Sequence, residues 1–228
     1  MTPLNYLDIH THLRTHRSDA VVVASMSVEE ILTLSSSEKF QCAGIHPWWL
    51  EDYKTDEILK LKVQIEKLLS LNKLWAIGET GIDRSSKDTL SEQVSLFHWH
   101  LELSEKYGLP LIIHSVRSGS DFLQILNEKK PKSPWIFHDF RGNENLVKDL
   151  LRLHPECYFS FGISLDNSSH SRELLPLVPL EHVFFETDDQ KHLDIHDIYL
   201  RASHFLGLDV DDLKSQTWMN FRKIAKFL

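Results

Sequence analysis

A strand followed by a helix, repeated along the chain, is the feature that most constrains the fold. Short runs rich in β-branched and aromatic residues recur, and each closes on a polar or charged residue or on glycine. Such runs are typical of buried parallel strands. The expected strands are residues 4–10, 20–25, 41–46, 74–79, 110–114, 134–138, 157–162 and 182–188.

Segments with helical periodicity lie between most of these strands. They cover residues 27–39, 55–70, 89–107, 119–130, 143–153 and 169–177, and residues 209–228 form a final helix expected to pack under the sheet. Ser27 and Glu30 have the spacing of a capping box, and Gly108 stands where a helix C-terminus belongs. Eight strand–helix units predict a (β/α)8 TIM barrel of the amidohydrolase type. The unit between His12 and Ala20 is too short for a full helix, so the barrel is expected to be trimmed there.

Composition limits the class of protein and its partners. A chain of 228 residues with 42% hydrophobic and 25% charged residues predicts one folded domain, residues 1–228. The net charge of −8 excludes a chain-wide basic field for long nucleic acids. Two distant cysteines predict no disulfide and suit a reducing compartment. Without a recognisable signal peptide or apolar span, we expect a cytoplasmic protein with no membrane partner and no obligate protein partner.

Histidines and carboxylates gather at the expected strand ends, where barrel enzymes carry their catalytic groups. The first strand ends in Asp8-Ile9-His10-Thr11-His12, and a period of two places Asp8, His10 and His12 on one face. The later ends are His46, Glu79, His114, His138 and Asp188. A lone histidine at such a position is usually structural, but six filled strand ends favour a metal site. The histidines in helices and loops, including His98 and His100, are expected to be structural.

The number of ligands predicts two metals. His10, His12 and Asp188 serve one ion, His114 and His138 serve the other, and Glu79 can bridge them. Two ions about 3.5 to 4 Å apart activate water and stabilise a displacement at phosphorus. Ligation by nitrogen and oxygen without thiolate suits Zn, Mn, Mg or Fe.

The motifs at these positions resemble the TatD family of metal-dependent hydrolases. The resemblance extends nearly from end to end and is carried by DIHTHL at 8–13, GIHP at 44–47, AIGETGID at 76–83, Gln93 with HLEL at 100–103, LPLIIHS at 109–115, HDFRG at 138–142, FG at 161–162 and ETD at 186–188. It implies that His46 faces the substrate phosphate and that the metal ligands are His10, His12, Glu79, His114, His138 and Asp188. It also implies 3′ to 5′ trimming of DNA.

Two positions depart from the family pattern, which indicates a divergent member. Asp188 is followed by Asp189 where relatives continue with proline and then an arginine-containing stretch, and Val116 replaces a common arginine. By strand parity, Asp189 is expected to point away from the cavity.

Several other residues receive smaller roles. Trp48 and Trp49 are expected either to stack a base or to pack at the rim. Asp83 and Asp139 either hydrogen-bond ligand histidines or cap helices. The cations expected either to bind phosphate oxygens or to remain solvated are Arg117, Arg141 and Lys191.

These features predict a metal-dependent phosphodiesterase, a TatD-like deoxyribonuclease acting on short single-stranded DNA or a small phosphodiester. Asp188 doubles as the base, and Glu79 and His46 complete the catalytic set. The alternatives are an amidohydrolase or phosphatase acting on a small molecule and, outside the enzymes, a barrel kept as an interaction module.

Overall fold

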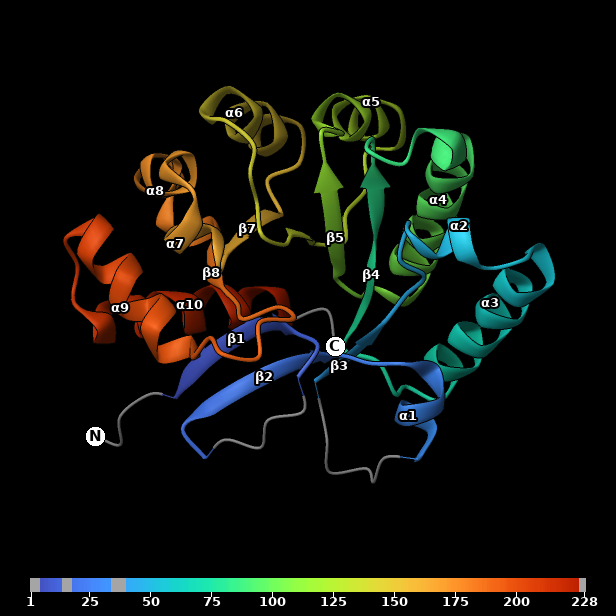
Figure 1. The fold of residues 1–228 in the computed structure, drawn as a ribbon, viewed down its shortest axis with the longest axis horizontal. Coiled ribbons are helices and arrows are strands. Elements are labelled where there is room, and N and C mark those ends of the chain that lie inside the picture. Colours follow the sequence, from blue (N-terminus) through green and yellow to red (C-terminus); the bar gives the residue numbers. More distant parts are fainter. Residues whose placement is uncertain (1–4, 14–17, 34–39, 226–228) are drawn as a thin grey trace.

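Eight parallel strands follow one another in sequence order around a nearly closed barrel (Figure 1). The computed structural model describes residues 5–13, 18–33 and 40–225. The two ends of the sheet meet where the backbone N–H of His12 donates to the carbonyl of Asp188 over 3.0 Å. The predicted TIM barrel is confirmed. The strands are β1 (Tyr6–Thr11), β2 (Ala20–Ser25), β3 (Gln41–Ala43), β4 (Ala76–Asp83), β5 (Leu111–Val116), β6 (Trp135–Phe137), β7 (Cys157–Phe161) and β8 (Val183–Phe185).

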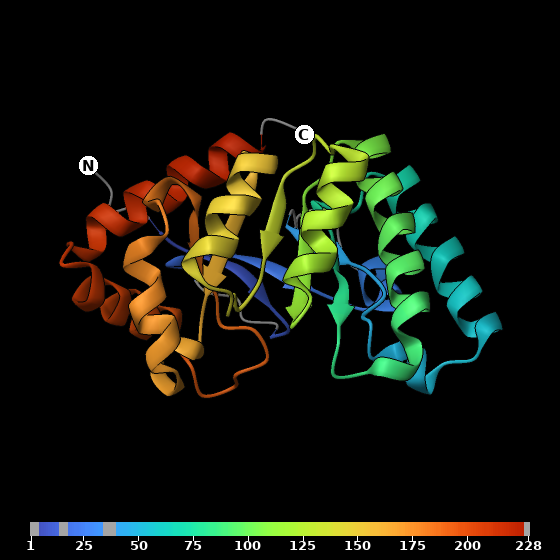
Figure 2. The same ribbon diagram turned by 90° about the horizontal axis from the view of Figure 1, so that it is seen from above.

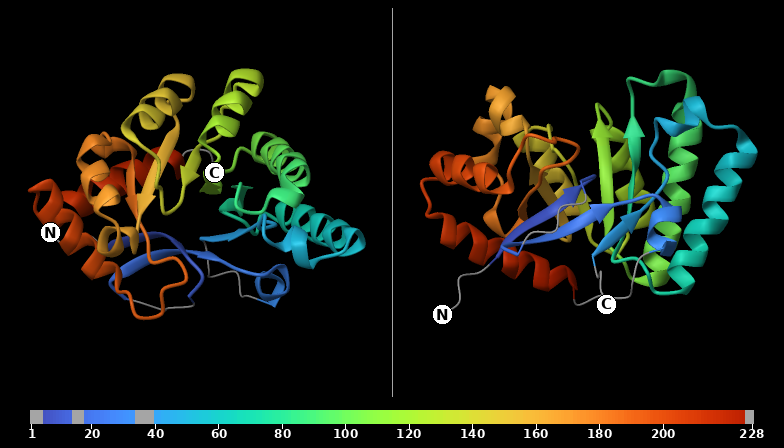
Figure 3. Two further views of the ribbon diagram at one scale, coloured as in Figure 1. Left: turned by 45° about the horizontal axis from the view of Figure 1, so that its top comes forward. Right: turned by 60° about the horizontal axis from the view of Figure 1, so that its bottom comes forward.

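Helices cover the outer side of most of the sheet (Figures 2 and 3). The capping box of Ser27 and Glu30 is formed, and Gly108 ends its helix with a left-handed φ of 66°. None of the described helices has the length and apolar character needed to cross a bilayer. The helices are α1 (Val28–Thr33), α2 (Trp49–Asp52), α3 (Thr55–Ser70), α4 (Leu90–Tyr107), α5 (Gly119–Lys129), α6 (Glu144–Leu153), α7 (Ser164–Asn167), α8 (Ser169–Leu174), α9 (Ile195–Leu206) and α10 (Val210–Ile224), with 3₁₀ turns at Lys87–Thr89, Leu175–Leu177 and Leu180–His182.

Several element boundaries differ from the predicted ones. Strands β3, β6 and β8 end before His46, His138 and Asp188, so these residues lie in the loops that leave the strands. Strand β4 instead continues four residues past Glu79. Helices α2, α7 and α9 were not predicted from the sequence, although α9 buries residues at helical spacing. Four parts of these predictions lie outside the described residues: residue 4 of the first strand, residues 14–17 of the trimmed unit, and helix residues 34–39 and 226–228.

Buried residues form two layers. The outer layer joins strand residues such as Ile77 and Ile113 to helix residues such as Phe97. The inner layer takes residues from all eight strands, including Ile112, and fills the barrel. Helix α10 closes the end of the barrel where the strands begin, because Phe221 stacks on the Trp75 ring at 4.9 Å. The opposite end stays open for the site.

Candidate metal centre

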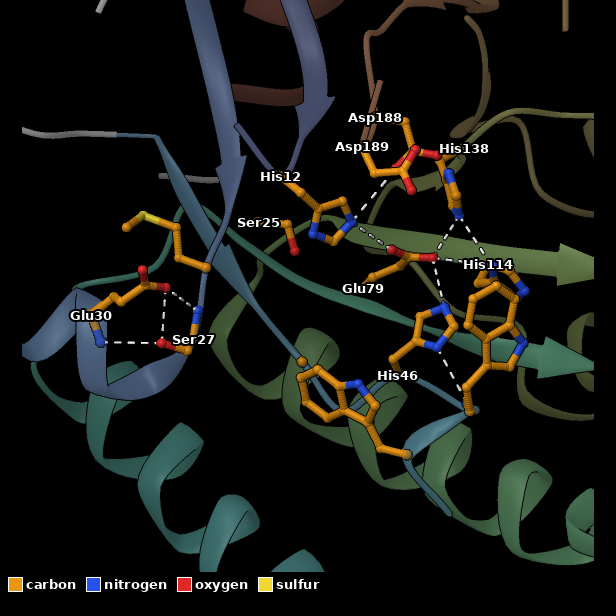
Figure 4. Close-up of a pocket in the computed structure, with 14 residues that line it drawn as sticks. His12, Ser25, Ser27, Glu30, His46, Glu79, His114, His138, Asp188 and Asp189 are labelled. Carbon is orange, nitrogen blue, oxygen red and sulfur yellow. Dashed lines mark hydrogen bonds and ion pairs between the residues drawn. The ribbon is translucent and has the colours of Figure 1, made fainter. Parts of the chain in front are cut away.

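A pocket of about 480 Å³ opens where the strands end. Figure 4 shows ligand-type side chains of this pocket converging on Glu79. The pocket is lined by six of the residues expected from the sequence to bind metal or act in catalysis: His12, His46, Glu79, His114, His138 and Asp188. The structure therefore brings together side chains that are as many as 176 positions apart in the sequence.

The Glu79 carboxylate is the centre of this cluster. Its Oε2 lies 3.2 Å from His12 Nε2 and 3.4 Å from His10 Nε2. The other oxygen, Oε1, faces three more imidazoles: His138 Nε2 at 2.7 Å, His114 Nδ1 at 3.0 Å and His46 Nε2 at 3.0 Å. One carboxylate thus contacts five rings from four different segments.

Asp188 completes one side of the cluster. Its Oδ1 lies 3.6 Å from His10 Nε2 and 3.5 Å from His12 Nε2. His10, His12, Glu79 and Asp188 form one group whose candidate ligand atoms all lie within 4.8 Å of one another. Two further groups meet the same limit, His46 with Glu79 and His114, and His138 with Glu186 and Asp188.

A bulge in each of two strands turns ligands into the barrel. On β4, Gly78 and Glu79 together oppose the single residue Ile112 of β5. Ile77 packs in the outer layer, so strict alternation would turn Glu79 outward as well. The extra residue reverses this, as bulges beside active sites commonly do.

The bulge on β1 has the same effect on His10. Ile9 and His10 together oppose Val23 of β2. Asp8 therefore does not share the metal-facing side with His10 and His12, which corrects the expectation from a period of two. Its carboxylate instead accepts hydrogen bonds from the backbone N–H of Thr187 at 3.1 Å and from Thr187 Oγ1 at 2.6 Å. This contact fixes the residue that precedes Asp188.

Gly81 allows β4 and β5 to approach closely beside the cluster. A Cβ at this position would lie 1.9 Å from the His114 carbonyl oxygen, and the φ of Gly81 is +157°. No other residue fits both conditions. The close approach keeps the His114 backbone beside the Glu79 segment.

We predict that Gly81→Ala lowers both the melting temperature and the metal affinity. Backbone strain alone costs about 1–3 kcal/mol, and the clash moves His114 away from Glu79. Gly207→Ala is the control, because Gly207 has a left-handed φ of +65° but nothing within 4 Å of the added Cβ. Thermal unfolding and metal titration of both variants test this. Equal metal affinity in the two variants would contradict it.

The outer nitrogens of two ligand-type histidines face carboxylates. His114 Nε2 lies 3.1 Å from Asp83 Oδ2. Burial would raise the pKa of Asp83, but hydrogen bonds from Ser85 and Trp48 lower it to about 2, so this carboxylate is ionised. His138 Nδ1 lies 3.5 Å from Glu186 Oε1. Ring protons at these outer positions leave His114 Nδ1 and His138 Nε2 as lone pairs that face the cluster.

The two inward nitrogens lie only 3.2 Å apart. Both also lie within 3.0 Å of Glu79 Oε1, which is itself an acceptor. Three acceptors in contact repel one another unless a positive charge lies among them. One proton satisfies a single contact, whereas a metal cation satisfies all three. Imidazoles held from behind by carboxylates are also the usual arrangement of histidine metal ligands.

A buried histidine of the cluster has no hydrogen-bond partner among the described protein atoms. His10 is 0% exposed, and neither of its ring nitrogens makes a hydrogen bond within the described chain. Such groups are rare in proteins unless water or an ion binds them. The residues present therefore fit the divalent cations predicted from the sequence.

The pKa values of the cluster follow its charge. Burial would raise the pKa of Glu79, but the charge of His138 and the contacts from His10 and His114 outweigh it and hold this pKa well below its usual range. Burial would lower the pKa of His138, yet Glu79 and Glu186 raise it well above its usual value. For Asp188, burial and then the charge of Glu186 raise the pKa. The field at Glu79 thus favours positive charge.

The predicted rim residues occupy different places. Trp48 lines the pocket and is 53% exposed, and its indole N–H donates to Asp83 Oδ2 over 2.7 Å. The Trp48 ring lies 4.7 Å from that of His46, and Trp49 lines the same pocket. Asp189 also lines it, which corrects the expectation that it points away. Strand β8 ends at Phe185, so strand parity no longer applies there.

The predicted phosphate-binding cations do not line this pocket. Arg117 is exposed, with a φ of 54°, and Lys191 is also exposed. Arg141 binds Asp139 at 2.6 Å, so the Asp139 carboxylate pairs with this arginine instead of a ligand histidine. Asp83, in contrast, contacts His114. This is the first of its two predicted alternatives, a hydrogen bond to a ligand histidine.

Glu186 is the functional candidate to which the sequence analysis gave no role. It is fully buried, and its two oxygens accept hydrogen bonds from the backbone N–H of Asp139 and from Ser160 Oγ. A signal was present in the sequence, because within the expected strand 182–188 Glu186 has the same parity as Asp188 and as Phe184, which lies in the inner layer.

Comparisons with known proteins identify the family. The family described as TatD related DNase matches residues 13–226. The chain belongs to this family. TatD-family relatives include an uncharacterized metal-dependent hydrolase of Buchnera aphidicola subsp. Baizongia pistaciae, 28% identical over 97% of this chain and 91% of its own length. The human protein described as the 3′-5′ RNA nuclease TATDN2 is 32% identical over 64% of this chain and 19% of its own length.

Solved structures show the same fold. The crystal structure of YjjV, a TatD homologue from Escherichia coli K12, has a TM-score of 0.80 at 18% identity and covers 96% of this chain and 97% of that chain. An uncharacterized amidohydrolase from Saccharomyces cerevisiae has a TM-score of 0.74 at 16% identity, with coverage of 97% and 100%. The TatD resemblance inferred from the motifs is confirmed, and this chain is a metal-dependent hydrolase of that family.

Proposed function

We propose that this TatD-family hydrolase cleaves phosphodiester bonds with two divalent metal ions, as a deoxyribonuclease that trims DNA from the 3′ end. The contact of three acceptors, His114 Nδ1, His138 Nε2 and Glu79 Oε1, is the observation that carries the metal part. The family description as TatD related DNase and the human relative described as a 3′-5′ RNA nuclease support the substrate class.

The donor set divides into two groups that share Glu79. His10, His12 and Asp188 would hold one ion, and His114 and His138 would hold the other, with one Glu79 oxygen facing each group. When bound, a pair of divalent ions lowers the pKa of a bridging water and stabilises charge on the phosphoryl oxygens. Zn, Mn, Mg and Fe all suit these nitrogen and oxygen donors.

Residues of the chain then orient the ligand histidines and the substrate and accept the proton of the attacking water. Asp188 accepts the proton of the attacking water through its carboxylate. Asp83 and Glu186 hold the rings of His114 and His138, whose outer nitrogens face them. His46 faces the substrate phosphate, and the exposed Trp48 ring offers a surface for a base.

The pocket favours a short substrate over long duplex DNA. Arg117 and Arg141 are not among the lining residues, and Asp189 adds negative charge at the mouth. A net charge of −8 works in the same direction, because few phosphates can be neutralised. We therefore propose short single-stranded DNA or a small phosphodiester as the substrate of this barrel domain.

Metal removal and replacement test the proposal. Purified protein is expected to bind up to two divalent ions per chain, to lose hydrolysis in chelator and to regain it when metal returns. Labelled single-stranded DNA, a dinucleotide, a generic phosphodiester and a phosphomonoester are compared across Zn, Mn, Mg and Fe. Full activity in exhaustive chelator contradicts the metal mechanism. A preference for the monoester contradicts phosphodiester specificity.

A further inference from the structure

A buried histidine outside the ligand set binds the two chain segments that carry His46 and Glu79. His100 of α4 is 0% exposed. Its Nε2 lies 3.1 Å from the backbone N of Ile45, and its Nδ1 lies 2.9 Å from Thr80 Oγ1 and 2.9 Å from the carbonyl of Leu96. Ile45 directly precedes His46, and Thr80 directly follows Glu79.

The partners of His100 determine where its proton lies. The backbone N–H of Ile45 can only donate, so Nε2 must present its lone pair, and the ring proton lies on Nδ1. Nδ1 donates to the Leu96 carbonyl and stays in contact with Thr80. Only the neutral ring can make this set of bonds. Burial lowers the pKa of His100 to about 3, which keeps the ring neutral over the working range.

The backbone near His46 needs such a partner. The β3–β4 ladder ends at Ala43, which is paired with Ile77. Beyond it the two chains still approach closely, because a Cβ on Gly44 would lie 2.7 Å from the Glu79 carbonyl oxygen. The Ile45 N–H, which has passed the end of the ladder, is accepted by the imidazole. His100 therefore joins the end of β3 to the bulged part of β4.

We infer that His100 is a positioning residue that sets the distance between His46 and the Glu79 carboxylate, 3.0 Å in the structure. It does not face the pocket, and it acts through the backbone of Ile45 and through Thr80. The inference rests on the proposed metal centre for its effect on activity. Its geometric part, protection of the Ile45 amide, can be measured without metal.

Two substitutions at His100 and one matched control test the inference. His100→Leu removes both ring nitrogens. His100→Gln keeps a side-chain oxygen that can accept from Ile45. His154→Leu is the control, because His154 is equally a buried histidine, 3% exposed, and its Nε2 meets the carbonyl of Ser133 at 2.9 Å. His154 does not line the pocket.

Amide hydrogen exchange of Ile45, metal titration with Zn²⁺ or Mn²⁺ alone, and hydrolysis kinetics are measured for each protein. His100→Leu is expected to exchange the Ile45 amide at least about 10-fold faster and to lose about 10- to 100-fold in metal affinity, as when the partner of a ligand is removed. His100→Gln is expected to keep most of the protection of the Ile45 amide and most of the metal affinity. His154→Leu is expected to change only the melting temperature. Losses in kcat are expected to exceed those in KM.

Three results overturn the inference. They are fast exchange of the Ile45 amide in the wild-type protein, wild-type metal affinity in His100→Leu, and equal metal losses in His100→Leu and His154→Leu. If His100→Leu does not fold, failure of His100→Gln to protect the Ile45 amide has the same meaning. Absence of hydrolysis by the wild-type protein contradicts the proposed function instead, and amide exchange still decides the role of His100.

Discussion

Glu79→Gln is expected to abolish metal binding and hydrolysis while the barrel stays folded. The substitution keeps the size of the side chain but removes the one negative charge shared by five imidazoles. The loss should exceed the roughly 10- to 100-fold typical when a partner of a metal ligand is removed, since Glu79 would itself contact both ions. Metal analysis of the purified variant and its rate on a generic phosphodiester give the result.

The metal-free variant provides a second measure of the same contact. Without metal, Glu79 raises the pKa of His138 and His138 lowers the pKa of Glu79, as in an ion pair, and glutamine cannot replace that charge. The melting temperature without metal should therefore fall in the variant, and the increase on adding metal should disappear. Glu102→Gln on the exposed side of α4 controls for the change in net charge. A near-normal rate with two ions bound would show that the bridging role is wrong.

The barrel was predictable because its signal is repeated. Eight apolar runs, most of them followed by a helical segment, specify the topology even where individual predicted boundaries are wrong. Parallel strands bring their C-terminal ends to one mouth, so residues such as His46, His114 and Asp188 were expected to meet. The structure does bring them together around Glu79. Local pattern and global fold agree here.

The bulges were the part that strand periodicity could not give. Glu79 was selected as a strand end, but it lies in the middle of β4 and reaches the pocket only because β4 has an extra residue opposite Ile112. Gly78 inside the strand was the available signal, since glycine in a strand often marks a bulge. Which side chain a bulge redirects depends on pairing with the neighbouring strand, and one sequence does not contain that information.

Loop residues were the least predictable part of the site. Asp189 follows the short strand β8, and the backbone turns at Asp188, whose φ is 53°. Parity arguments fail once the chain leaves the ladder. Arg141 is bound by its near neighbour Asp139, a local pairing that competes with any role at the pocket. Charge type alone therefore did not locate the cations.

Asp188→Asn is expected to lower turnover by about 10²- to 10⁴-fold, the usual effect of a lost general base. Its backbone N–H donates to the His10 carbonyl, and its carbonyl accepts from the His12 N–H, each over 3.0 Å. These bonds do not involve the side chain, so the variant keeps its position. The amide oxygen can still offer a lone pair near His10 and His12, but it cannot take a proton at neutral pH. Metal affinity should therefore fall much less than kcat.

Asp189→Asn separates this role from the acidity of the pocket mouth. Asp189 also lines the pocket, but it belongs to none of the groups whose atoms could hold a metal among the described residues. Its carboxylate instead accepts a hydrogen bond from the Gln190 amide. The substitution should change kcat by less than about 10-fold, well below the loss of a general base. It should also improve KM for longer DNA, because one charge that repels phosphate is removed. Metal analysis and steady-state kinetics on both variants decide the assignment, and equal losses of kcat would place the base at Asp189 as much as at Asp188.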